Sequence, residues 1–418
     1  MKTETLIMKT LPSGMSCYII PRVGYVTAQA MVCVRYGSMD VSFAVNGVRR
    51  STPGGTAHFL EHKMFENASG VPGMFAAFAA LGADVNAFTN FRATAYTCAG
   101  TINFTACLRT LLAAVLQNGP HITDENVEKE GGIIKQEIRM YNDDPYWVSY
   151  FDMLGALYHD SPVRAHIAGT EADVDAITKE TLLDCYDVFY RPQNMAVICA
   201  GDFAEPDAVF DVVERTVPQK VALDAARARG EERAGAAKEF TRRVMGVTQP
   251  VFHIGIKDAQ PYAHTPREMA AARLALELLC GEGSTLYAAL YDDGLIDNGF
   301  HADYQTDDTY GVSLLAGVSN VPQKVYEALL RGIERLKAEG VVQSDFEHVK
   351  RKQCGRFLRG LNSLDAVLGA QCACFIRGTD INAMREAYET VALADVQERL
   401  LAFGAPGSTS LAVVEGGK

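Results

Sequence analysis

The sequence lacks the features that mark membrane-spanning and nucleic-acid-binding proteins. Its longest apolar stretch, Met74 to Ala83, is too short to cross a bilayer, which takes about 20 residues. Basic residues are in the minority, because 39 Lys and Arg stand against 51 Asp and Glu and the formal net charge is −12. A surface that binds phosphates needs positive charge. Nucleic acids and membranes are therefore not expected as partners, and a basic or neutral partner fits better.

Cysteine motifs are scarce as well. The cysteines include no CxxC pair and a single CxC, at Cys372 and Cys374, in an apolar stretch where burial in the core is the simpler explanation. The first residues, MKTETLIMKTL, hold no unbroken apolar segment of the kind that a signal peptide contains. We therefore expect reduced thiols and a cytoplasmic protein.

The organisation of the chain indicates two duplicated halves. Residues 223–243 are rich in Ala, Arg and Glu and poor in bulky apolar residues, which is typical of an exposed linker. The domains expected on this basis are residues 1–222 and 244–418. Two stretches, 78–100 and 287–317, also share one pattern: an amphipathic helix, a Gly-rich turn and two alternating segments that end in Ala-Gly. Such an echo predicts duplication of one α+β unit.

Periodicity predicts strands and helices that are interspersed and not strictly alternating. Two-residue alternation predicts strands at 27–36, 93–99, 195–200, 251–256 and 312–316. Helical spacing of apolar residues predicts helices at 104–117, 124–141, 179–190, 268–279, 324–339 and 344–361. The fold class expected is α+β, with two homologous repeats that each form a mainly antiparallel sheet covered by helices on one face.

A short histidine motif is the most informative local feature. His58, Glu61 and His62 form an HxxEH pattern after the breaker run Pro53-Gly54-Gly55. On a helix the two imidazoles, four residues apart, share one face, and the glutamate lies beside them. Two neutral imidazoles can bind Zn²⁺ while a nearby carboxylate takes a proton from a water at the metal. A pair of surface histidines beside an acid is the alternative.

A third ligand for such a site has two candidates downstream. Glu130 and Glu137 lie seven residues apart, and therefore on one face of the helix predicted at 124–141. Gly131 and Gly132 stand between them, and because a glycine inside a helix costs about 1 kcal/mol, another element is expected to approach closely there. One carboxylate would bind the metal and the other would orient a ligand. The pattern does not choose between them, and a solvated Glu on a charged helix is the ordinary alternative.

The segments around these residues resemble the inverzincin zinc peptidases, the family of pitrilysin, insulin-degrading enzyme and mitochondrial processing peptidase. The similar segments are GGTAHFLEHKMFE, LGADVNAFTNFRATAY, VEKEGGIIKQEIRMYNDDP, PVRAHIAGTEADVDAITKETL and FYRPQNMAVICAGD. The HxxEH order, the later Glu-x6-Glu pair and the RPQNM segment before a strand follow the family's order and spacing. The likeness is close from residue 14 to about 202 and looser beyond. The half-length size is most similar to cytoplasmic members from Gram-positive bacteria.

The resemblance implies a zinc-dependent endopeptidase that hydrolyses short or unfolded peptides. His58, His62 and Glu137 would bind Zn²⁺, and Glu130 would support the ligand sphere. Glu61 would activate a zinc-bound water as the general base.

A substrate site is implied as well. Asn86 and Ala87 match the place where family members hold the substrate backbone as an added edge strand. Asn as a turn residue before a strand is the structural alternative.

The second half departs from the family pattern at one place. Single-chain and homodimeric members usually carry an Arg followed about seven residues later by a Tyr, and this pair stabilises the oxyanion and orients the substrate. Here Tyr291 stands at the Arg position, and Asp297 or Asn298 stands near the Tyr position. A heterodimer with a homologous chain that supplies the pair is therefore expected, with a homodimer as the other dimeric state. The alternative is a weakly active or non-catalytic peptide-binding or assembly subunit of the same family.

The remaining histidines show no ligand spacing. Each is interpreted as a surface or core histidine: His121, His159, His166, His253, His264, His301 and His348.

Overall fold

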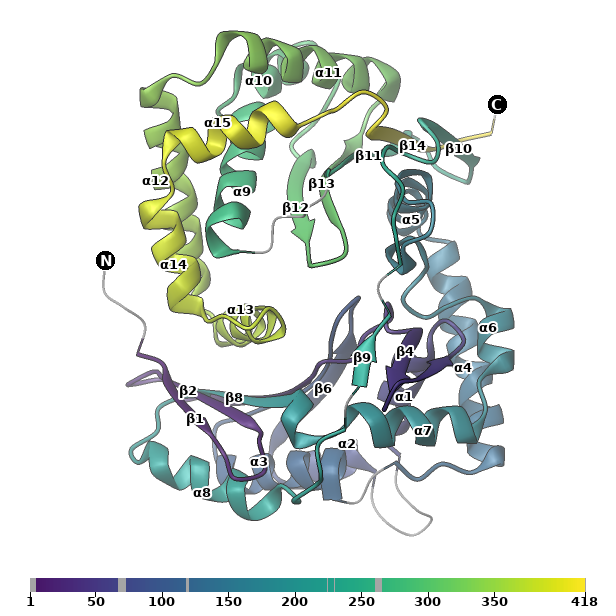
Figure 1. Cartoon of the computed structure of the whole chain (residues 1–418), viewed down its shortest axis with the longest axis vertical. Coiled ribbons are helices and arrows are strands. Elements are labelled where there is room, and N and C mark those ends of the chain that lie inside the picture. The colour runs from purple at the N-terminus through teal and green to yellow at the C-terminus, as the bar shows by residue number, and fades with distance from the viewer. Residues whose placement is uncertain are drawn as a thin grey trace. The chain divides into compact units, whose positions relative to one another are not determined.

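The computed structural model (Figure 1) describes residues 5–66, 73–117, 120–223, 225–228, 230–259 and 265–417. His264 therefore lies outside the described residues. The chain divides into two compact units that are discontinuous in sequence. The first unit comprises Met1–Ile138, His166–Ala228 and Arg359–Ile381, and the second comprises Arg139–Ala165, Arg229–Leu358 and Asn382–Lys418.

The first unit holds two sheets and the helices that cover them. Its strands are β1 (Ile7–Thr10), β2 (Ser16–Pro21), β3 (Ala28–Val34), β4 (Ser42–Val45), β5 (Val48–Ser51), β6 (Ala83–Thr89), β7 (Thr94–Gly100), β8 (Met195–Gly201) and β9 (Ala225–Arg227). Its helices are α1 (Thr56–Lys63), α2 (Met74–Ala80), α3 (Phe104–Leu112), the π-helical turn η1 (Ala113–Gln117), most of α4 (Asp124–Asn142), α6 (Glu171–Ala176), α7 (Lys179–Phe189), the 3₁₀ turn η3 (Pro192–Asn194), α8 (Pro206–Thr216) and α13 (Leu364–Ile376).

The second unit is built on one sheet. Its strands are β10 (Phe240–Val244), β11 (Val251–Lys257), β12 (His301–Thr306), β13 (Gly311–Val318) and β14 (Thr409–Glu415). Its helices, each by all or most of its length, are α5 (Pro145–Leu157), the 3₁₀ turn η2 (Pro162–Arg164), α9 (Pro266–Cys280), α10 (Thr285–Asp292), α11 (Pro322–Glu339), α12 (Gln343–Gly360), α14 (Ile381–Thr390) and α15 (Leu393–Ala402).

The two large sheets share one topology. In the first unit the order is β1-β2-β8-β3-β7-β6, and in the second it is β10-β14-β11-β13-β12. Each sheet has one parallel pair, β2 with β8 and β10 with β14, and its other pairs are antiparallel. When β1 is left out, β2, β3, β6, β7 and β8 of the first sheet take the same places as β10, β11, β12, β13 and β14 of the second. The predicted fold class, α+β with two repeats and mainly antiparallel sheets, is confirmed.

The predicted elements form with small shifts at their ends. Each strand and helix expected from periodicity has its counterpart, and the two echoing stretches become α2-β6-β7 and α10-β12-β13. The residues at 223–243 differ from expectation. They contain β9, which pairs with β4, and most of β10, which pairs with β14, and no helix forms among the described residues there. The prediction that this segment separates the two repeats, 1–222 and 244–418, stays a prediction.

The repeats exchange one helix each. The helix α5 follows α4 along the chain but belongs to the second unit, where it packs on β11 and β14. Its approach is so close that a Cβ on Gly255 would lie 2.3 Å from Leu157 Cδ1. The equivalent helix α13 belongs to the first unit and packs on β3 and β8 (Figure 1). There the Arg35 guanidinium donates to the Phe375 carbonyl at 2.6 Å and lies over the Phe375 ring.

Helix α13 covers the sheet face opposite the main core of the first unit. That core joins alternate residues of the central strands, such as Val32 and Val197, to Leu108 of α3. Cys372 and Cys374 on α13 are buried, as predicted, and no disulfide forms among the described residues. No helix in the described part of the chain is both long enough and apolar enough to cross a membrane.

Candidate metal centre

The HxxEH segment forms the helix α1, whose start is fixed by glycine. Gly55 precedes the first helical residue with φ +78°, and a Cβ at this position would lie 2.1 Å from the Ala168 carbonyl oxygen. Only glycine tolerates that combination. The Thr56 hydroxyl donates to the Pro53 carbonyl at 2.7 Å. Because α1 is buried along most of its length, its polar side chains must find partners within the protein.

Two histidines of α1 and one glutamate of α4 converge on a single point. Glu137 Oε1 lies 3.6 Å from His58 Nε2, and Glu137 Oε2 lies 3.5 Å from His62 Nε2. One ligand atom from each residue lies within 4.8 Å of the other two, and the described residues contain no other such group of three. The sequence placed the histidines together by spacing, and the tertiary structure adds the carboxylate.

Glu130 lies behind this group. Its Oε1 is 2.8 Å from His62 Nδ1, so Nδ1–H donates to the carboxylate, and loss of the proton on Nε2 directs that nitrogen's lone pair at the convergence point. Burial disfavours a charged His62, but the contacts with Glu130 and Glu137 and the charge of Glu61 outweigh it and raise the pKa of His62 to about 9. The same contact lowers the pKa of Glu130. The two acids that the sequence left unassigned thus take different positions.

The glycines of α4 do not explain its position. A Cβ on Gly131 would meet Phe59 of α1 at 3.8 Å and Val174 at 3.5 Å, which is ordinary packing, and nothing lies within 4 Å at Gly132. The predicted close approach at these glycines is therefore wrong. The helix is held instead by apolar residues such as Ile134, which is 1% exposed.

Glu61 lies between α1 and the end of β6. Its Oε2 accepts a hydrogen bond from Thr89 Oγ1 at 2.6 Å. The side chain is buried, and burial raises its pKa despite this hydrogen bond and the nearby charges of His58 and His62. A carboxylate with a raised pKa is suited to taking up a proton.

The donor set fits Zn²⁺. Two imidazole nitrogens and one carboxylate oxygen are ligands that this ion prefers, and three protein ligands leave a position open. The Nδ1 atom of His58 is buried without a hydrogen-bond partner among the described residues, so its Nε2 is the nitrogen held at the centre.

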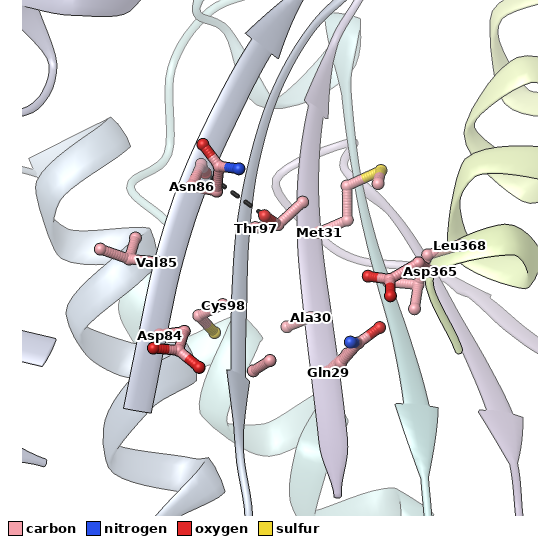
Figure 2. Close-up of a pocket in the computed structure, with 11 residues that line it drawn as sticks. Gln29, Ala30, Met31, Asp84, Val85, Asn86, Thr97, Cys98, Asp365 and Leu368 are labelled. Carbon is pink, nitrogen blue, oxygen red and sulfur yellow. Dashed lines mark hydrogen bonds between the residues drawn. The ribbon is translucent and has the colours of Figure 1, made fainter. Parts of the chain in front are cut away.

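Asn86 and Ala87 lie in the middle of the edge strand β6. Asn86 pairs with Thr97 of β7, so the interpretation of Asn86 as a turn residue is wrong. Thr97 Oγ1 donates to the Asn86 carbonyl at 3.3 Å, as Figure 2 shows, and Asn86 Oδ1 accepts from the Ala87 N–H at 2.9 Å. Because β6 ends the sheet, its other edge has no strand beside it among the described residues.

His166, which was interpreted as a surface or core histidine, interacts electrostatically with His58 and Glu137. Burial and the charge of His58 lower its pKa to about 4, while Glu137 acts in the opposite direction. The Ala168 N–H donates to His166 Nδ1 at 3.1 Å, which leaves Nε2 as the protonated nitrogen. A Cβ on Gly169 of the same turn would lie 2.6 Å from the Gly54 carbonyl oxygen, so the turn packs on the start of α1. In the sequence, the AHIAGT segment that resembles the family could have indicated that His166 lies near the metal centre.

Comparison with known proteins places this geometry in a family. Residues 26–171 match the model described as Insulinase (Peptidase family M16), and residues 176–353 match the model described as Peptidase M16 inactive domain. The uncharacterized zinc protease YmfH of Bacillus subtilis is 33% identical over 406 residues, which cover 94% of this chain and 92% of that protein. The chain belongs to the M16 peptidase family, and the resemblance to inverzincins is confirmed.

Solved structures agree. An M16-like peptidase from Alicyclobacillus acidocaldarius superposes with a TM-score of 0.94 at 34% identity, over 100% of this chain and 99% of that one. Pitrilysin matches 99% of this chain but only 45% of its own length, with a TM-score of 0.77 at 15% identity, which shows a common fold.

Proposed function

We propose that the chain is a zinc-dependent endopeptidase of the cytoplasm that cleaves short or unfolded peptides. The observation that carries this is the convergence of His58, His62 and Glu137 beside the buried carboxylate of Glu61. The three residues would hold Zn²⁺, which when bound polarises a peptide carbonyl and acidifies water. The relatives named zinc proteases support the same assignment.

Glu61 is the general base in this proposal. Its carboxylate takes a proton from the attacking water and returns it to the leaving amine. Thr89 holds one of its oxygens, which leaves the other available for the proton. Glu130 acts through His62 by fixing the orientation of the imidazole.

The free edge of β6 is the proposed peptide site. In an antiparallel ladder consecutive residues direct their N–H and C=O groups to opposite sides. The Asn86 carbonyl faces β7, so Val85 and Ala87 direct theirs to the open edge. A peptide paired there is bound through its main chain, and its far end reaches Thr89 beside Glu61.

Substitution Glu61→Gln tests the proposal. We expect cleavage of a quenched peptide to fall by about 10²–10⁴, while the zinc content stays near one ion per chain. The matched control is Glu128→Gln, which changes an exposed acid of α4 with the same chemistry. Full hydrolysis by the Glu61→Gln variant would refute the assignment of the base.

A non-catalytic or weakly active peptide-binding subunit is the second candidate. Tyr291, which stands in the sequence where the family usually has Arg, is 46% exposed and stacks on Tyr287. In the main proposal a homologous partner supplies the missing Arg and Tyr. Assay of the chain alone and with such a partner separates these cases, because equal activity without the partner excludes the heterodimer.

A further inference from the structure

A hollow of about 180 Å³ lies on the face of the first sheet that carries α13. Figure 2 shows it between β6 on one side and α13 on the other, with β7 and β3 beneath. Its existence follows from side-chain size. The floor on β7 consists of Thr97 and Ala99, which are small, and α13 does not reach over them.

Strand register places the walls of the hollow. Asp84 pairs with Ala99, and Ala99 pairs with Gln29 on β3; Asn86 pairs with Thr97 in the next row. Residues paired directly across strands share one face of the sheet. Asp84 and Asn86 therefore face the hollow from the edge strand, as Figure 2 shows.

The hollow accepts hydrogen bonds and carries negative charge. Asp84 on β6 and Asp365 on α13 stand on opposite sides, with the amide of Asn86 on the side of Asp84 and the amide of Gln29 near Asp365. Neither Lys nor Arg is among the residues that line it. A long side chain with a cationic end fills the space and matches the charge.

We propose that this hollow selects a Lys or Arg side chain of the peptide that pairs with β6. This inference rests on the proposed function, because it takes the free edge of β6 as the peptide site. A peptide residue opposite Asp84 presents its side chain on the same face, with Cβ atoms about 5 Å apart. Lys and Arg are long enough to lean across the edge strand into the hollow.

The position of the selected residue follows from the strand. Thr89, which contacts Glu61, lies five residues after Asp84 on β6. At about 3.3 Å per residue, the selected side chain stands roughly 17 Å from the bond that is cut. The hollow thus recognises a residue well away from the scissile bond.

A peptide scan tests the inference. Quenched peptides of otherwise neutral sequence carry one Lys, Gln or Glu at successive positions up to seven residues on either side of the cut. We expect Lys to raise kcat/KM about fivefold over Gln at a single position four to six residues from the cut, and Glu to lower it. Asp84→Asn should bring the Lys/Gln ratio close to one, and Asp84→Lys should make Glu the favoured residue at that position.

Controls separate this inference from the proposed function. Asp211→Asn removes an exposed acid of α8 and should keep the Lys preference, so a loss there would point to net charge and overturn the inference. A wild-type chain without preference, or an Asp84→Asn chain that retains it, overturns it as well. Fluorescence anisotropy with the Glu61→Gln variant measures binding alone. If no peptide is cleaved by wild type but binding still favours Lys and depends on Asp84, the hollow stands and the catalytic assignment fails.

Discussion

The two units share a strand order, and both bury acids paired with cations, as Asp40 with Arg92 and Arg227 in the first. Among the described residues, only the first unit also gathers buried acids around histidines. In the first, the buried acids Glu61 and Glu130 lie among imidazoles that can give up a proton. In the second, the described residues contain no such group, and the acids Glu232 and Asp258 pair with Lys257 and Arg399.

Two acids of the second unit, Glu232 and Asp258, have more than one hydrogen-bond donor each. Glu232 accepts hydrogen bonds from Lys257 Nζ at 2.6 Å and from the backbone N–H groups of His159, Asp160 and Ser161 at 2.7 to 2.9 Å. Asp258 accepts from Tyr304 at 2.7 Å and from Arg399.

The same strand order therefore does not by itself create a metal site, because the ligand group is found only in the first unit among the described residues. An acid paired with Lys or Arg has its hydrogen bonds satisfied, whereas acids around imidazoles stand beside nitrogens that can lose a proton and bind a metal ion. The predictions below test this contrast.

Loss of a proposed ligand should have the largest effect, and only in the first unit. His62→Ala should abolish stoichiometric zinc, and Glu130→Gln should weaken zinc binding about 10–100-fold because the imidazole loses its orienting partner. Chelator competition with metal analysis measures both. Zinc binding unaltered by His62→Ala would break the contrast between the units.

Loss of the Lys257 ammonium group should instead destabilise the second unit. Lys257→Met leaves Glu232 buried without its main partner, and removal of one member of a buried pair costs about 3–5 kcal/mol. Urea unfolding measures the loss. Zinc content per folded chain should not change, and a fall in zinc would show that the units do not behave separately.

The Glu232 pair should also respond to acid. Burial opposes the charge of Glu232, but Lys257 and the backbone N–H groups prevail and lower its pKa below 4.5. A lowered carboxyl pKa contributes stability above the unfolded value and loses it as pH falls through the folded value. Wild type should therefore lose stability below about pH 4.5 more steeply than Glu232→Gln. Urea unfolding at several pH values checks this, and Glu231→Gln, an exposed neighbour, should behave as wild type.

The smallest expected effect concerns α4. Gly132 is exposed and nothing lies within 4 Å of an added Cβ, so Gly132→Ala should stabilise the chain by up to about 1 kcal/mol without loss of zinc. Thermal unfolding measures the gain. Destabilisation would instead indicate that another element approaches α4 closely at this glycine, as the sequence suggested.

The elements that the sequence predicted well carry a strong apolar pattern. The helices α4 and α11 each bury one apolar face, and the apolar strand β8 is buried along its whole length. The short strands β4 and β5 were missed because four residues carry little pattern, although the Asn46-Gly47 turn between them is a local hairpin signal. Only the pairing of β4 with β9 depends on a segment far along the chain.

The sequence by itself determined the pairing of His58 with His62, which follows from helical spacing over four residues, and the two repeats, which follow from one pattern that recurs in both halves. It could not choose between Glu130 and Glu137, place His166 beside the site, or assign α5 and α13 to the opposite units. Those outcomes depend on which distant segments pack together. Only the tertiary structure decides them, since it is the burial of whole faces and not local spacing that brings these residues into contact.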